Sequence, residues 1–261
     1  MGKKFVIIIL VVFLGCKPVD SWYMIPIEGY APYFVEAYME HGSPLEFTLF
    51  ESQPLKDSLL LKPVWNANAL LMDELGNQYE LENLFYRRGE DGRVVNYVYV
   101  DSIDWEAQAF ELQFTLTDGT ILASQTRAIK PPDLIAFGND VSRLWLSFNH
   151  QDDDDYYRLV TDYYINGERN YQKSQTYELL KQGEESWTIA FNHPTTIEYD
   201  SMVVHYYKYT EDAYRFFESV RKAKVGIVDP TSPAVPILSN IEGGSGIFSY
   251  VWHDTIHIRR N

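Results

Sequence analysis

Four consecutive acidic residues are the first candidate for chemistry in this chain of 261 residues. Asp152, Asp153, Asp154 and Asp155 could supply oxygen ligands to Ca²⁺, which takes six to eight of them. The residues that follow depart from an EF-hand loop, because no Gly stands at the sixth position and no Glu at the twelfth. We therefore favour a solvated loop between two strands, with a calcium site as the alternative.

Two histidines four positions apart are the second candidate. On a helix His253 and His257 would face the same way and could share a zinc ion. Their β-branched neighbours (VWHDTIHI) predict a strand instead, on which the two rings lie about 13 Å apart. A single metal ion cannot bridge that distance. The remaining histidines are scattered, and we expect them on the surface: His41, His150, His193 and His205.

A glycine-rich segment resembles two catalytic motifs and fits neither. Gly243-Gly244-Ser245-Gly246 lacks the glycine that a nucleophile elbow needs at position 247, which is Ile. It also lacks the lysine of a P-loop and leads into a predicted strand. We expect these glycines to provide positive φ angles or close backbone approach. No Asp/Glu pair can be assigned acid and base roles, and no cofactor motif is present, so we expect a protein that is not an enzyme.

Tyrosine is abundant, with 20 residues, and several stand in pairs along predicted strands. Neighbours on a strand point to opposite faces, so one member of each pair is expected to face outward. Outward tyrosines suit sugar, peptide or protein binding. The alternative is ordinary β-propensity. The tyrosines concerned are Tyr156, Tyr157, Tyr163, Tyr164, Tyr206, Tyr207 and Tyr209.

The single cysteine follows a secretory signal. Residues 1–15 contain Lys3, Lys4 and an apolar run that is too short to span a bilayer, and they predict a signal peptide. Phe13-Leu14-Gly15-Cys16 resembles a bacterial lipobox, in which the cysteine is acylated and becomes the first residue. Cys16 is thus the predicted lipidation site, with residues 16–24 as a lipidated tether to the outer membrane. The alternatives are an ordinary signal peptide cut nearby or a free cysteine.

Composition excludes several other classes. The net charge is −15, from 22 Lys and Arg against 37 Asp and Glu, and it becomes −17 once Lys3 and Lys4 leave with the signal. Such a chain offers no phosphate-binding surface, so no nucleic-acid partner is expected. One cysteine forms neither an internal disulfide nor a thiolate zinc site.

The elements that would position these residues are mostly strands. Alternation of apolar and polar residues in Phe110–Leu116, followed by Asp118-Gly119, predicts a hairpin. Asn166-Gly167 predicts another. Further strands are expected at Leu45–Phe50, Leu70–Leu81 with a turn at Gly76-Asn77, Tyr97–Val100, Leu144–Phe148, Tyr156–Ile165, Trp187–Phe191, Met202–Tyr209 and Phe248–Ile258.

The fold class is therefore mainly β, with two β-sandwich domains. Residues 25–130 predict an immunoglobulin-like or transthyretin-like sandwich. Pro131-Pro132 predicts the boundary, and a turn inside one domain is the alternative. Residues 133–261 predict a second sandwich with one short helix at about 211–224, capped by Thr210 and ended by Gly226 and Pro230.

Several segments together resemble one family. Pro236 to Phe248 (PILSNIEGGSGIF) is similar to the closing signature of the domain of unknown function 4249 family. The hairpin at 66–81, the segments Tyr156-Tyr157-Arg158 and Ile165-Asn166-Gly167-Glu168, and the helix at 214–217 also resemble that family. The resemblance implies a β-sandwich lipoprotein of Bacteroidota outer membranes, often found beside a TonB-dependent transporter. It supplies no catalytic or binding residue.

Three functions follow as hypotheses. The first is a non-enzymatic accessory lipoprotein that binds a ligand or a TonB-dependent transporter through exposed tyrosines and acidic loops. The second is a surface hydrolase that uses an Asp/Glu pair about 5–10 Å apart. The third is a purely structural envelope protein. Neither the ligand nor the membrane face can be read from the sequence.

Overall fold

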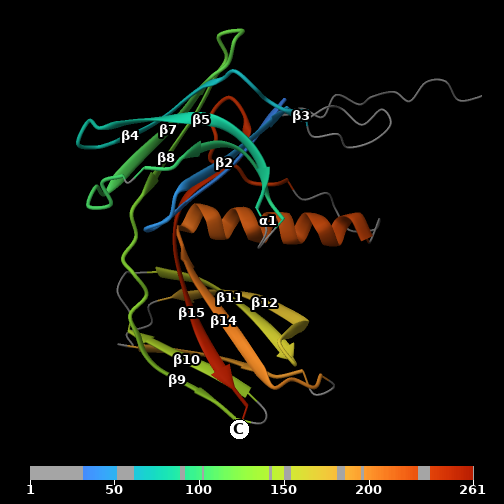
Figure 1. The fold of residues 1–261 in the computed structure, drawn as a ribbon. Coiled ribbons are helices and arrows are strands. Elements are labelled where there is room, and N and C mark those ends of the chain that lie inside the picture. Colours follow the sequence, from blue (N-terminus) through green and yellow to red (C-terminus); the bar gives the residue numbers. More distant parts are fainter. Residues whose placement is uncertain are drawn as a thin grey trace, which may run out of the picture. The chain divides into compact units, whose positions relative to one another are not determined.

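The computed structural model describes residues 32–51, 62–88, 92–101, 103–140, 143–149, 154–180, 186–194, 197–228 and 236–260. All of them belong to one compact unit, Ala31–Asn261. The predicted signal peptide, Cys16 and the tether lie outside the described residues. The fold class is confirmed: the chain is mainly β, with one helix among the described residues (Figure 1).

The first half of the described chain supplies eight strands. They are β1 (Tyr33–Glu40), β2 (Leu45–Glu51), β3 (Lys62–Pro63), β4 (Asn68–Asp73), β5 (Gln78–Arg87), β6 (Val94–Tyr99), β7 (Ala109–Thr115) and β8 (Ile121–Arg127). Strand β5 passes from one layer to the other, since Leu81 pairs with Ala69 of β4 and Glu82 with Val98 of β6. The two layers enclose a core that includes Leu71, Tyr97, Phe114 and Phe248.

The second half supplies the remaining strands. They are β9 (Leu134–Asn139), β10 (Arg143–Asn149), β11 (Asp154–Ile165), β12 (Glu168–Leu180), β13 (Ser186–Asn192), β14 (Ser201–Tyr209) and β15 (Ser245–Arg259). A three-stranded sheet in the order β13-β10-β9 faces the strands β12-β11-β14-β15. Leu146, Phe148, Tyr157 and Met202 are among the residues of this second core.

Strand β15 connects the two halves. Its first seven residues pair in parallel with β1, from Phe34–Ser245 to Glu40–Val251. Its remaining length pairs antiparallel with β14, from Tyr209–Val251 to Ser201–Arg259. The last strand therefore contributes to both cores, and the domain boundary at Pro131-Pro132 stays a prediction.

The helix α1 (Glu211–Val228) covers one face of this junction (Figure 1). Thr210 caps it as predicted, because its Oγ1 accepts from the Ala213 amide at 3.4 Å. The predicted end was wrong: the helix continues through Gly226, since one glycine lowers helix propensity by only about 1 kcal/mol. Phe216 and Ala213 pack with Tyr156, Tyr209, Ile247 and Val251.

This helix also corrects the prediction for the tyrosine pairs. Tyr157 is buried in the core between the sheets, and its neighbour Tyr156 is buried beneath α1 on the opposite face. Both faces of β11 are covered at this point. Tyr206 and Tyr209 are buried too, which leaves Tyr164 and Tyr207 only partly exposed. The expectation of one outward tyrosine in each pair is therefore wrong at Tyr156-Tyr157.

The predicted turns are confirmed by their dihedral angles. Asn166 and Gly167 have φ of 52° and 81°, which is the geometry of a two-residue hairpin turn. Gly76 and Gly119 have φ of 90° and 87°. Strand β11 begins at Asp154, so Asp154 and Asp155 lie in a strand rather than a loop. Asp152 and Asp153 lie outside the described residues.

Two kinds of feature are absent from the described residues. No group of three or more His, Cys, Asp or Glu is arranged to hold a metal ion in the part of the chain that the structure describes. Within the same residues, no helix combines the length and the apolar character needed to cross a membrane.

Candidate ligand-binding cleft

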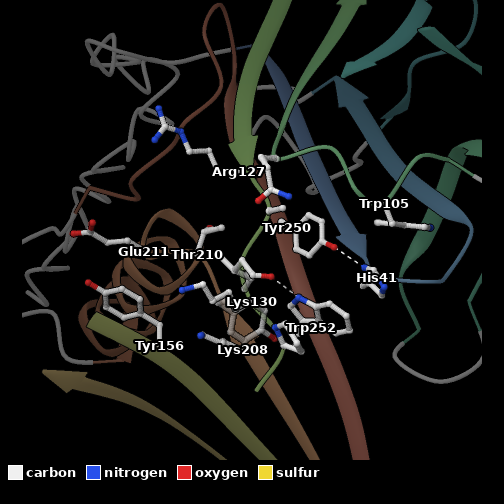
Figure 2. Close-up of a pocket in the computed structure, with 15 residues that line it drawn as sticks. His41, Trp105, Arg127, Lys130, Tyr156, Lys208, Thr210, Glu211, Tyr250 and Trp252 are labelled. Carbon is white, nitrogen blue, oxygen red and sulfur yellow. Dashed lines mark hydrogen bonds between the residues drawn. The ribbon is translucent and has the colours of Figure 1, made fainter. Parts of the chain in front are cut away.

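An open cleft of about 860 Å³ lies where β15 passes between the two cores (Figure 2). Its walls come from the end of β1, the segment before β7, the β8–β9 connection, β11, and the passage from β14 into α1. The lining residues are His41, Trp105, Gln108, Arg127, Ala128, Ile129, Lys130, Pro131, Tyr156, Lys208, Tyr209, Thr210, Glu211, Tyr250 and Trp252.

Aromatic rings form one side of the cleft. The His41 imidazole stacks on the Trp252 indole with centroids 3.9 Å apart and 23° between the ring planes. Trp105 lies 5.0 Å from the His41 ring and meets Tyr250 edge to face at 5.9 Å. All four side chains gather on one side of Figure 2. Such a wall offers flat, weakly polar surface to a ring-bearing ligand.

Hydrogen bonds hold these rings in place. Burial raises the pKa of Tyr250 to about 12, so its hydroxyl keeps its proton at neutral pH. That hydroxyl is hydrogen-bonded to His41 Nδ1 at 2.6 Å, and burial lowers the pKa of the His41 imidazole. At pH 7 the His41 imidazole is therefore mainly neutral. The Trp252 indole N–H donates to the Ile129 carbonyl at 2.5 Å, which ties the β8–β9 connection to β15.

Positive charge lies on the opposite side. Lys130, Lys208 and Arg127 line the cleft against a single carboxylate, Glu211. Glu211 is in turn paired with Arg215 one helical turn on. Lys208 is only 2% exposed, although lysine is rarely buried. In Figure 2 the amines of Lys130 and Lys208 point the same way, toward Tyr156. A cluster of cations in a chain of net charge −15 favours an anionic ligand.

A smaller hollow of about 630 Å³ shares Arg127, Thr210 and Glu211 with the cleft. Its other charged lining residues are acidic: Asp73, Glu74, Glu111 and Asp212. Asp73 accepts hydrogen bonds from the backbone of Leu75 and Asn77, at 2.9 Å each, and from the Asn77 and Tyr79 side chains. Glu74 accepts from the Gln108 amide at 2.8 Å. These two carboxylates stabilise the hairpin turn and its neighbouring loop.

The sequence-derived candidates lie elsewhere. Gly243 and Gly246 have φ of 74° and 117°, and a β-carbon on either would meet a backbone carbonyl oxygen, so the conformational role is confirmed. His253 and His257 lie on one strand, as predicted. His193 was wrongly expected on the surface: it is 6% exposed and contacts Tyr163 Oη and Asn139 Oδ1. His150 lies outside the described residues.

Sequence reasoning missed the cleft. Trp105, Trp252 and Lys208 were not singled out, and His41 was considered only as a surface residue. One residue of the cleft gave a local signal in the sequence. Lys208 is a charged residue within the Tyr-rich run of β14, and the alternation of apolar and polar residues would place it beside buried neighbours. The other residues converge only through long-range strand pairing.

The fold and the cleft together define a β-sandwich protein with a ligand-sized hollow where its two cores meet. The chain matches the domain of unknown function DUF4249 over residues 26–255 and belongs to that family. No curated protein matches the chain.

The solved structures that the chain resembles are distant. One is a pullulanase complexed with maltotriose from Anoxybacillus sp. LM18-11, at 13% identity and a TM-score of 0.21 over 67% of this chain and 24% of that one. The chain thus spans about a quarter of the pullulanase. A cytokine receptor complex has 10% identity and a TM-score of 0.28, covering 69% and 92%. A DUF3823 family protein from Parabacteroides merdae has 8% identity and a TM-score of 0.23, covering 68% and 91%. These likenesses support no conclusion about function.

Proposed function

We propose that this protein is a non-enzymatic, lipid-anchored component of the outer membrane that binds a ligand in the cleft. Its partner in this role is a TonB-dependent transporter. The observation that carries the binding function is one cleft lined both by the aromatic wall of His41, Trp105 and Trp252 and by the buried Lys208. The membrane anchor rests on Cys16 and its lipobox-like context, and the transporter rests on the family resemblance.

The chemistry of the cleft indicates the class of ligand. Ring stacking on Trp252 and Trp105 requires a flat ring face. The three cations that line the cleft favour a negative group on the same ligand. A ring-bearing anion, such as an acidic sugar or an aromatic carboxylate, meets both conditions.

Calorimetric titration of the full chain, purified in mild detergent, tests this function. The probes are glucuronate and benzoate, with glucose and benzyl alcohol as their uncharged counterparts. We expect the anions to bind at least tenfold more tightly than the uncharged probes, a difference of about 1.4 kcal/mol. Equal binding of charged and uncharged probes, or no binding of either anion, would contradict the proposal.

Matched variants localise the binding. Trp252→Ala is expected to weaken anion binding about tenfold, whereas Trp65→Ala removes a partly exposed tryptophan outside the cleft and should not change it. Arg127→Gln alters only an exposed side chain, so the variant should fold normally and still bind the anions more weakly. An equal loss of anion affinity in Trp65→Ala would place the ligand outside the cleft.

Membrane attachment and the partner are tested separately. Metabolic labelling with palmitate should mark the wild type, and Cys16→Ser should abolish the label and release the protein from the membrane fraction. A mild-detergent pull-down of the native protein should recover a TonB-dependent transporter. Recovery of the protein alone would count against the transporter.

A surface hydrolase remains the second candidate, because acidic side chains line the hollow beside the cleft. Incubation with oligosaccharides and peptides, followed by mass spectrometry, separates the two functions. A binding protein leaves these probes intact. Turnover that Glu111→Gln abolishes would favour the hydrolase.

A further inference from the structure

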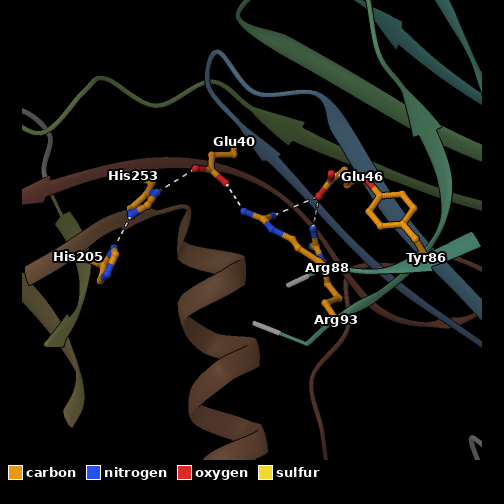
Figure 3. Close-up of polar contacts among 7 residues, drawn as sticks. All are labelled: Glu40, Glu46, Tyr86, Arg88, Arg93, His205 and His253. Carbon is orange, nitrogen blue, oxygen red and sulfur yellow. Dashed lines mark hydrogen bonds and ion pairs between the residues drawn. The ribbon is translucent and has the colours of Figure 1, made fainter. Parts of the chain in front are cut away.

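Two histidines from neighbouring strands lie side by side outside the cleft (Figure 3). His205 on β14 and His253 on β15 place Nδ1 of the first 3.2 Å from Nε2 of the second. Their rings are nearly parallel, with 26° between the planes and centroids 5.4 Å apart. The strand register produces this contact, because His205 is opposite Thr255 and Tyr207 is opposite His253.

Carboxylates hold the outer nitrogens of both rings. Glu40 Oε1 lies 2.9 Å from His253 Nδ1, and Asp162 Oδ2 lies 3.5 Å from His205 Nε2. A carboxylate can only accept a hydrogen bond, so His253 Nδ1 carries the proton that Glu40 accepts.

Further contacts fix these groups. Arg88 pairs with Glu40 at 3.4 Å, and it also pairs with Glu46 on β2. Gln172 donates to Asp162 at 2.8 Å. The His253 ring stacks on Tyr207 with centroids 4.4 Å apart and 8° between the planes. The two imidazoles are therefore held in place before any ligand arrives.

The inner nitrogens share a hydrogen bond across 3.2 Å. A metal ion can take the place of the proton in that bond, and the proton is then released to solvent. A metal ion bound about 2.0–2.1 Å from each nitrogen would subtend about 100° at that spacing, near the angles of tetrahedral and square-planar sites.

We propose that His205 Nδ1 and His253 Nε2 together bind one divalent transition-metal ion of the class that prefers imidazole, namely Cu²⁺, Ni²⁺ or Zn²⁺. The carboxylate behind each imidazole is the arrangement that orients metal-binding histidines and raises their basicity. Glu40 and Asp162 act as positioning residues, and they do not coordinate the ion.

The surroundings suit an exchangeable ion. The His205 and His253 side chains are 25% and 20% exposed, so an ion can reach them from solvent. Two protein ligands leave the remaining coordination positions to water or to an external ligand, as in sites that are open rather than structural. The net charge of −15 attracts a cation to the surface.

Metal titration of the untagged full chain in detergent, after removal of metal with a chelator, tests the site. Calorimetry with Cu²⁺ should show one tight equivalent. His205→Ala and His253→Ala should each weaken it at least tenfold, whereas His257→Ala, which removes an exposed histidine of the same strand, should not. Electron paramagnetic resonance of the Cu²⁺ complex should show two nitrogen ligands in the wild type and one in either single variant.

Glu40→Gln keeps both ligands and tests the positioning role. It should weaken Cu²⁺ binding about tenfold while the spectrum still shows two nitrogens. This variant also keeps the test decisive if a histidine variant fails to fold. The absence of a tight equivalent in the wild type, or an equal loss of affinity in His257→Ala, would overturn the site and leave only a hydrogen bond between the rings. An unchanged affinity in Glu40→Gln would overturn the positioning role of that carboxylate.

Discussion

The carbonyl oxygen of Val35 occupies the place where a β-carbon on Gly246 would stand, 1.8 Å from it. The two residues are opposite each other in the parallel pairing of β1 with β15. Gly246 also has φ of 117°, which side-chain-bearing residues rarely adopt. The close approach of β1 to β15 therefore requires glycine at this position.

Gly246→Ala should lower the free energy of unfolding by more than about 3 kcal/mol, because strain in φ adds to a clash with backbone. Gly119→Ala is the matched control. It also has positive φ, but nothing lies within 4 Å of its added carbon, so it should cost only about 1–2 kcal/mol. Urea unfolding followed by tryptophan fluorescence measures both. Equal losses would refute the role of the Val35 contact.

Local sequence patterns predicted the hairpins, because the two residues of such a turn determine its backbone geometry themselves. Asn166-Gly167 and Asp118-Gly119 join strands whose alternation sets the buried face. The same patterns could not reveal that β15 pairs with β1, about 210 positions earlier in the chain. Nor could they reveal that α1 covers the second face of β11, which is why Tyr156 and Tyr157 are both buried.

At the candidate sites, too, local sequence patterns could not reveal contacts between strands that are far apart in the chain. His253 and His257 were correctly predicted to lie apart on one strand. The histidine that contacts His253, namely His205, lies on another strand. The cleft combines residues from the turn after β1 and from β8, β14 and β15. The glycine-rich segment was correctly interpreted from sequence alone, because its constraint is on its own backbone.

Asp73→Asn should destabilise the protein at neutral pH and much less in acid. Burial alone would raise the pKa of Asp73, but hydrogen bonds from Asn77, Tyr79 and Leu75 outweigh it and hold the pKa below the usual 3.8. A carboxyl with a lowered pKa stabilises the fold above its usual pKa, and that contribution disappears as the pH falls through the lowered value. Urea midpoints of variant and wild type should therefore stay apart from pH 7 to about pH 4 and converge as the pH falls further. A constant difference would contradict this account.

His193 should make the protein less stable in mild acid. Burial lowers the pKa of its imidazole below 6.5, so below that pH the unfolded chain takes up a proton more readily than the folded chain. Stability should fall as the pH drops from 6.5 to the lowered value and then level off. His193→Gln should remove this slope, while His257→Gln, at an exposed position, should keep it. Thermal unfolding between pH 7.5 and pH 5 provides the measurement.

Thr210 stabilises the start of α1 and also lines the cleft. Its Oγ1 accepts from the Ala213 amide at 3.4 Å and lies 2.8 Å from Ser249 Oγ on β15, so one hydroxyl joins the helix to the strand. Thr210→Ala should lower the free energy of unfolding by about 0.5–2 kcal/mol, whereas Thr210→Ser keeps the oxygen and should change it little. Because the cap also sets the direction of the first helical turn, Thr210→Ala should weaken anion binding in the cleft as well. Urea unfolding and calorimetric titration of both variants measure the two effects. If Thr210→Ser loses as much stability as Thr210→Ala, the effect comes from the threonine methyl group and not from the cap.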